Sequence, residues 1–227
     1  MTRLLMLVEG QSEESFVKRT LAPHLARYGV FVQVIVLWTK RLASGGGHRG
    51  GACNWGQIRR NLDALRADSH AWLTTLLDFY GLPDDVPGYQ EARSPGDPRQ
   101  RVNALQARLA AEVGHPRFIP FLALHEFEAW IFADSKALAA HFGRAELEQL
   151  AAKAIAMAGE PERINHGPDT HPKARLRAMG VGYKETSDGP ILLDKIGIPA
   201  IRAACPHFAD WLSQLENLPT RTKECPP

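Results

Sequence analysis

The chain has 227 residues, of which 44% are hydrophobic and 23% are charged, as is ordinary for a globular protein with one substantial core. A formal net charge of +2 does not indicate nucleic acid or a membrane as a partner, so any anion-binding surface has to be local. The three cysteines are widely spaced and form no CxxC pair, which argues against a zinc finger and favours free thiols in a reducing cytosol. Since no segment approaches the roughly 20 apolar residues of a membrane helix, a cytoplasmic protein is predicted.

Strand and helix signals alternate over the first 135 residues. Short apolar or β-branched runs predict strands at residues 4–8, 30–38, 72–77 and 118–122. Helical spacing predicts helices at residues 12–28, with a kink at Pro23, at 58–65 and at 102–112. The segment 43–56 is too rich in glycine for a stable element, and 78–98 has the turn residues of a long loop.

This alternation predicts an α/β fold in which helices flank a central, mainly parallel sheet. Beyond about residue 135 the strand signals fade, and helices are predicted at residues 146–157, 174–179 and 206–215. We therefore expect an α/β core at 1–135, a helical extension packed on it at 136–218, and a tail at 219–227.

Acidic residues follow the ends of three predicted strands. Glu9 follows the first strand, Asp78 the third, and Glu126 and Glu128 the fourth. Ligands of parallel sheets bind beyond the carboxyl ends of the strands, so these side chains are expected at one edge. Close carboxylates repel one another unless a proton or a cation intervenes, and carboxylate oxygens suit Mg²⁺ or Mn²⁺. The sequence thus predicts a divalent metal site formed by these residues, with Glu13 as a further ligand.

Each of these acids also has a simpler interpretation. Glu13 would complement the dipole of a helix start, and Asp78 could merely initiate a turn. Glu126 and Glu128 share a face only in an extended segment, and in a helix they point about 200° apart. The helical case places Glu128 on the apolar face and Glu126 on the polar face, so Glu128 is the preferred site residue of the two.

Four residues are candidates for contacting phosphate. Arg49 lies in the glycine-rich segment, Tyr80 follows Asp78, and Lys173 and Arg175 follow a turn-rich segment at 164–168. The functional interpretation is a flap and a loop that supply a local positive field. The alternative is a mobile surface loop and solvated basic side chains.

Five sequence blocks in order, VEGQSE, LLDFYGLP, FIPFLALHEFEAWIF, INHGPDTHPKARL and PHFADWL, resemble the DUF4276 family. That family is related to Toprim nucleases and OLD-like enzymes. The resemblance implies a Toprim-like fold that binds Mg²⁺ and acts on nucleic-acid backbones. It equates Glu9 with the first Toprim acid, Glu13 with the second acid of the OLD-like form, and Asp78 with the first aspartate. Tyr80 stands where a second aspartate is expected, which leaves the number of metals open.

The leading hypothesis is a Mg²⁺- or Mn²⁺-dependent nuclease in which Glu9, Asp78 and Glu128 carry the chemistry. The resemblance further implies phage defence and an AAA- or ABC-type ATPase partner. A degenerate Toprim-like adaptor that binds nucleic acid or an ATPase is the main alternative, and a phosphatase or nucleotide hydrolase is a third. The sequence does not distinguish DNA from RNA and does not define an oligomeric state.

Overall fold

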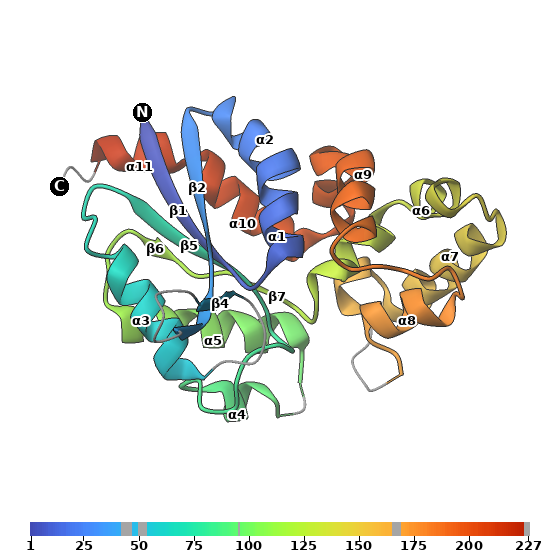
Figure 1. The fold of residues 1–227 in the computed structure, drawn as a ribbon, viewed down its shortest axis with the longest axis horizontal. Coiled ribbons are helices and arrows are strands. Elements are labelled where there is room, and N and C mark those ends of the chain that lie inside the picture. The colour runs from blue at the N-terminus through green and yellow to red at the C-terminus, as the bar shows by residue number, and fades with distance from the viewer. Residues whose placement is uncertain (42–46, 50–53, 95, 165–168, 225–227) are drawn as a thin grey trace.

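The computed structural model describes residues 1–41, 47–49, 54–94, 96–164 and 169–224 (Figure 1). Its main sheet has the order β2-β1-β5-β6, with β7 pairing the far end of β5. All of these pairings are parallel. The strands are β1 (Thr2–Val8), β2 (Val30–Val36), β5 (Trp72–Asp78), β6 (Phe118–Ile119) and β7 (Leu122–Ala123).

Helices cover both faces of this sheet (Figure 1). One face carries α1 (Gln11–Phe16), the π-helical turn η1 (Val17–Leu21) and α2 (Ala22–Ala26). The other carries α3 (Trp55–Leu65), α4 (Tyr89–Ala92) and α5 (Pro98–Val113). Leu4 and Met6 pack on the first side, and Leu5 and Leu7 on the second, because successive strand side chains point to opposite faces.

The rest of the chain is helical and shares the core of the sheet. Beyond Ala123 the described residues form no strand. The hydrophobic cluster on the α1 side runs from Leu4 to Leu218 and joins the C-terminal helices to the sheet. These elements are η2 (Phe127–Ala133), α6 (Ser135–Phe142), α7 (Glu146–Ala158), η3 (Pro161–Arg163), α8 (Pro172–Ala178), α9 (Asp188–Ala204), α10 (Pro206–Glu216) and α11 (Leu218–Glu224).

The predicted architecture of a mainly parallel sheet, flanking helices and a helical C-terminal part is confirmed. Several local expectations differ from the structure. The second strand ends at Val36, and the chain continues as β3 (Trp38–Arg41), which pairs in antiparallel fashion with β4 (Gly47–Arg49). Backbone pairing therefore gives regular structure to part of the glycine-rich segment.

The other differences follow from proline and from local turns. The fourth strand is split into β6 and β7 at Pro120, which has no N–H to donate to a ladder. Helix α4 lies within the expected long loop, and residues 219–224 of the expected tail belong to α11. None of the described helices combines the length and apolar character needed to cross a bilayer.

Candidate active site

Three neighbouring strands carry acidic residues to one end of the sheet. Glu9 directly follows β1, and Asp78 is the last residue of β5, the strand next to β1. β7 pairs with the end of β5 through Asp78 and Ala123, so Glu126 and Glu128 follow the next strand along. Asp78, Glu126 and Glu128 are all buried, with exposed fractions of 4%, 7% and 1%. The order of the strands thus brings these acids together at the carboxyl end of the sheet, as the sequence predicts.

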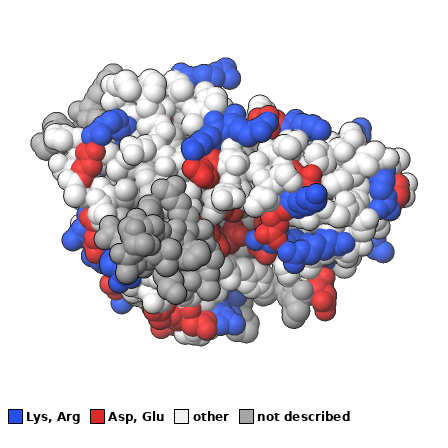
Figure 2. Space-filling model, viewed as in Figure 1, with Lys and Arg blue, Asp and Glu red and all other residues white. Residues whose placement is uncertain are grey.

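The ammonium group of Lys173 lies between three of these carboxylates. Lys173 is the second residue of α8. Its Nζ is 3.6 Å from Oδ2 of Asp78, 3.8 Å from Oε1 of Glu126 and 3.6 Å from Oε2 of Glu128. A fourth carboxylate, Glu185, lies 4.0 Å away. Figure 2 shows acidic side chains in a recess at the centre of this face, with basic side chains beside it. We call Glu9, Glu13, Asp78, Glu126, Glu128 and Lys173 the acid cluster.

Backbone donors hold two of the carboxylates in place. Phe127 N donates to Oδ1 of Asp78 at 2.9 Å, which ties the end of β5 to the start of η2. Lys173 N donates to Oε2 of Glu126 at 3.0 Å. Lys173 thus contacts Glu126 through both its main chain and its side chain, so the position of α8 depends on this residue pair.

Glu128 is the least satisfied member of the acid cluster. Its Oε1 is 3.5 Å from the hydroxyl of Tyr183, a long contact for an O–H donor. Its Oε2 accepts no hydrogen bond from the described part of the chain, and its nearest recorded cation is Lys173 Nζ. A buried carboxylate oxygen without a hydrogen-bond donor is costly, and such an atom marks a position where a ligand or ion would be stabilised.

Burial and mutual repulsion shift the titration of these groups. Burial raises the pKa of Glu9 to about 7, and the charge of Asp78 adds to the effect. Burial likewise raises the pKa of Asp78 to about 7, against the opposing charge of Lys173. Burial raises the pKa of Glu128 well above its usual range. Burial alone would lower the pKa of Lys173, but the carboxylates of Asp78 and Glu128 outweigh it and raise that pKa.

Glu9 and Glu13 sit against glycines that leave room for them. The backbone N–H of Gly10 donates to Oε2 of Glu13 at 2.9 Å, so Glu13 performs the helix-start role that was its simpler interpretation. Burial also raises the pKa of Glu13, and the charge of Glu9 contributes. A Cβ atom on Gly81 would lie 2.7 Å from Oε2 of Glu9. The glycine after Tyr80 is therefore required for Glu9 to occupy its observed place.

A tyrosine and a histidine border the acid cluster. His171 Nδ1 is 2.9 Å from Oε2 of Glu126. The ring of Tyr80 lies 6.4 Å from that of His171, and burial and the charge of Glu126 raise the pKa of Tyr80 to about 12. Tyr80 therefore stays a neutral phenol beside the carboxylates, which leaves its hydroxyl able to donate to a phosphate.

Of the two cases considered for Glu126, the helical one, which would place it on a polar face, does not hold. Glu126 has extended backbone angles, φ −140° and ψ 148°, because the helical turn η2 begins only at the next residue. Glu126 in extended geometry and Glu128 in the first turn of η2 both enter the buried acid cluster.

The basic residues expected to contact phosphate have different environments. Lys173 lies among the carboxylates instead of on an open surface. Arg175 Nε donates to the carbonyl of Thr170 at 2.9 Å and so braces the turn before α8. Arg49 belongs to β4, but its side chain lies outside what the structure describes, as do residues 165–168.

Three contributors had no clear signal in the sequence. His171 lies two residues before Lys173, and the proline between them could have indicated a helix start. Tyr183 and Gly81 had no recognisable signal, since each acts through a contact that forms only in the folded chain.

The donor atoms fit a hard divalent cation in kind, since all are carboxylate oxygens and one of them lacks a donor. As they stand, however, no three His, Cys, Asp or Glu side chains within the described ranges are close enough together to ligate one ion. The cation among these carboxylates is the ammonium of Lys173.

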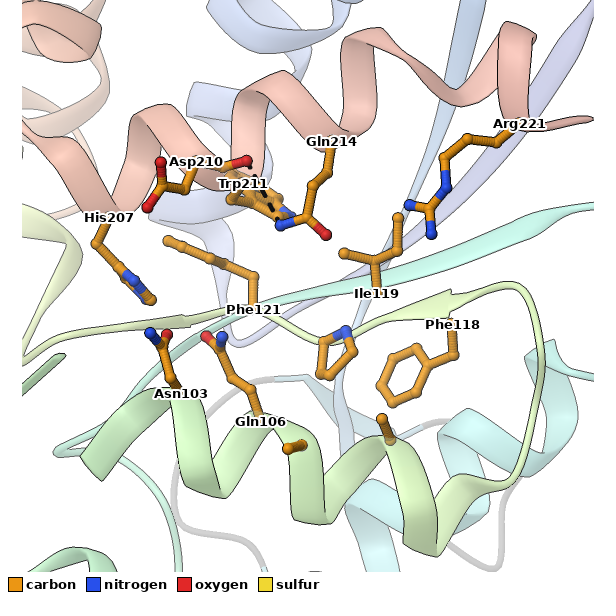
Figure 3. Close-up of a pocket in the computed structure, with 13 residues that line it drawn as sticks. Asn103, Gln106, Phe118, Ile119, Phe121, His207, Asp210, Trp211, Gln214 and Arg221 are labelled. Carbon is orange, nitrogen blue, oxygen red and sulfur yellow. Dashed lines mark hydrogen bonds between the residues drawn. The ribbon is translucent and has the colours of Figure 1, made fainter. Parts of the chain in front are cut away.

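A separate cleft of about 420 Å³ lies at the edge of the sheet formed by β6, between α5 and α10 (Figure 3). Phe121 and Trp211 stack in it with ring centroids 4.2 Å apart, and the amides of Asn103 and Gln106 border it. None of the acid cluster lines this cleft, and we assign it no role in the chemistry.

Comparison with known proteins gives a family and a distant structural likeness. Three solved structures of the C-terminal region of the OLD protein of Xanthomonas campestris pv. campestris match the chain at 15%, 16% and 14% identity. Each match covers 94% of this chain and 95%, 97% or 98% of the other, with TM-scores of 0.36, 0.35 and 0.38. These scores are too low to carry a structural argument. No curated protein matches the chain. The model of the family described as "Domain of unknown function (DUF4276)" matches residues 8–216, and the chain therefore belongs to this family.

Proposed function

We propose that this protein is a metal-dependent nuclease that hydrolyses phosphodiester bonds in DNA or RNA. The observation that carries the proposal is the acid cluster, in which carboxylates from separate segments meet at the carboxyl end of parallel strands. Burying this many carboxylates around one ammonium is unfavourable unless the site also serves a ligand. Raised pKa values grouped at the end of a sheet are typical of functional sites.

Glu9, Asp78, Glu126 and Glu128 would hold Mg²⁺ or Mn²⁺, with Glu13 supporting the position of Glu9. When bound, a divalent cation neutralises phosphate charge and lowers the pKa of a coordinated water. Glu9, which directly follows β1, would accept a proton from the attacking water.

The other polar groups would position the substrate. Lys173 is held by carboxylates on several sides and can donate to a phosphate oxygen. Tyr80 and His171 lie at the border of the cluster, where a neutral phenol and an imidazole can donate to the nucleic-acid backbone. An ATPase partner and a place in phage defence are further parts of this proposal, supported only by the family resemblance.

A nuclease assay with Mg²⁺ and with Mn²⁺ tests the proposal. Substrates should include single- and double-stranded DNA and RNA. Cleavage should require the metal and fall at least 100-fold in Asp78→Asn and Glu128→Gln. Glu91→Gln, an exposed carboxylate on α4, is the matched control and should retain full activity. Cleavage that persists in EDTA, or in both Asp78→Asn and Glu128→Gln, would refute the proposed function.

The ion pairs of Lys173 favour one alternative, a non-catalytic module that binds nucleic acid or an ATPase. In that case the ammonium is the permanent counter-ion of the acids and no metal enters. Calorimetric titration with Mn²⁺ distinguishes the two functions. A nuclease should show a site that Asp78→Asn abolishes, whereas the adaptor should show no such site.

A further inference from the structure

Strand β2 forms one outer edge of the sheet and has an unusual composition. It pairs with β1 and with no other strand that the structure describes (Figure 1). Its sequence, VFVQVIV, contains no charged residue and no proline. Phe31 is 43% exposed and Gln33 is also exposed. Natural proteins usually protect a long edge strand with charges, prolines or bulges, so an apolar edge of seven residues calls for a partner.

The hydrogen bonds at the two ends of β2 show which backbone groups face outward. Thr2 N donates to Gly29 O, and Leu37 N donates to Val8 O. In a parallel pair alternate residues bond to the neighbouring strand, so the odd-numbered residues of β2 face β1. The outward N–H and C=O groups belong to the four valines, Val30, Val32, Val34 and Val36.

The sequence of β2 is nearly the same in both directions about Gln33. An antiparallel copy centred there pairs Val32 with Val34 of the other chain, and Val30 with Val36. These are the residues with outward backbone groups, so they form the hydrogen-bonded pairs of an antiparallel ladder, with about eight hydrogen bonds in all. Phe31 then faces Ile35 in the closer, non-hydrogen-bonded pairs, where side chains make more contact.

The opposite edge of the sheet is closed. At that edge Leu122 N donates to the side chain of Gln106 at 2.9 Å, and Leu122 O is 3.0 Å from Nε2 of His207. Both side chains come from the helices that flank the cleft, α5 and α10 (Figure 3). The two edges thus differ. Side chains cap one at Leu122, whereas no strand in the described part of the chain pairs with the valines of the other.

We propose that β2 is a dimer interface in which two copies pair in antiparallel fashion about a twofold axis through Gln33. The partner is a second copy of this chain because the edge is complementary to itself in backbone register and in side chains. A strand of seven residues is about 23 Å long, which gives a small interface and a dissociation constant in about the micromolar range. The antiparallel arrangement places the two acid clusters at opposite ends of the joined sheet.

Charge substitutions at the twofold axis test this proposal without disturbing the core. Gln33→Glu and Gln33→Lys each bring two like charges together across the axis, and each should weaken self-association at least tenfold. An equimolar mixture of the two variants should dimerise again, because opposite charges then face each other. Gln149→Glu, on the exposed side of α7, is the control and should associate as the wild type does.

Sedimentation velocity from 1 to 100 μM measures association, and circular dichroism shows that each variant is folded. A wild-type protein that is monomeric throughout overturns the proposal. A dimer that is unaffected by both Gln33 variants, or a mixture that fails to associate, overturns it as well.

Discussion

Removing the ammonium from the acid cluster should make the stability of the protein strongly dependent on pH. Lys173→Met keeps much of the apolar stem of the side chain and deletes the charge that lies 3.6 Å from both Asp78 and Glu128. Removing one partner of a buried ion pair costs about 3–5 kcal/mol when the other partner stays charged. Only 22% of the Lys173 side chain is exposed, so this range applies with little reduction for solvent screening.

The size of the loss depends on the protonation of the acids. In the wild type the folded pKa of Glu9 and Asp78 is about 7, above the ordinary values of 4.5 and 3.8. The folded state therefore binds more protons than the unfolded chain, and stability falls as pH rises through this window. At pH 5.5 the buried acids are largely protonated, and Lys173→Met should cost only about 1 kcal/mol. At pH 8.5 it should cost the full 3–5 kcal/mol.

Urea unfolding of the wild type and Lys173→Met at pH 5.5 and 8.5, in EDTA, measures both losses of unfolding free energy. Lys153→Met, an exposed lysine on α7, is the matched control and should cost less than about 0.5 kcal/mol at either pH. Equal losses at pH 5.5 and 8.5 would refute the reasoning, because they would mean that the carboxylates are not ionised around the ammonium. Mn²⁺ should also stabilise Lys173→Met more than the wild type, since the ion and the ammonium compete for the same oxygens.

Three further predictions concern the surroundings of the cluster. Gly81→Ala should lower the rate of cleavage at least tenfold with little loss of stability, because the added Cβ would lie 2.7 Å from Oε2 of Glu9. Unchanged cleavage kinetics would contradict this role for the glycine. Glu162 accepts hydrogen bonds from the backbone N–H groups of His207 and Phe208 at the start of α10. Glu162→Gln should therefore lower the free energy of unfolding, measured in urea, by about 1–3 kcal/mol, while the folded variant retains cleavage. Mg²⁺ should raise the melting temperature of the wild type more at pH 8 than at pH 5.5, because protonated carboxyls bind metal poorly, and an equal shift at both pH values would count against a carboxylate site.

The sequence was informative where a signal is local. A short apolar run that ends in an acid places that acid at the carboxyl end of a strand, which located Glu9 and Asp78. The same reasoning placed Glu128 in the acid cluster, since a carboxylate between apolar neighbours needs a partner. The same helical pattern did not show that Glu126 is buried in the cluster. The residue at which an extended segment becomes a helix cannot be located from a period of 3.6 residues.

Contacts between distant segments were beyond local patterns. Lys173 was expected in a phosphate-facing loop near the acids, but not as their counter-ion. Because 95 residues separate it from Asp78, their pairing depends on the packing of α8 against η2. The role of Gly81 depends on the approach of a side chain from another strand end. Such features need the tertiary structure, because a propensity describes a residue and its near neighbours only.

The separation of the acids from their counter-ion has a consequence for biosynthesis. Glu128 leaves the ribosome about 45 residues before Lys173, which at 5–20 residues per second is a delay of roughly 2–9 s. If the strands pair within that interval, the carboxylates meet with no lysine to balance them. Protons or Mg²⁺ would then be the temporary counter-charge, and the yield of native protein during translation should respond to the magnesium concentration.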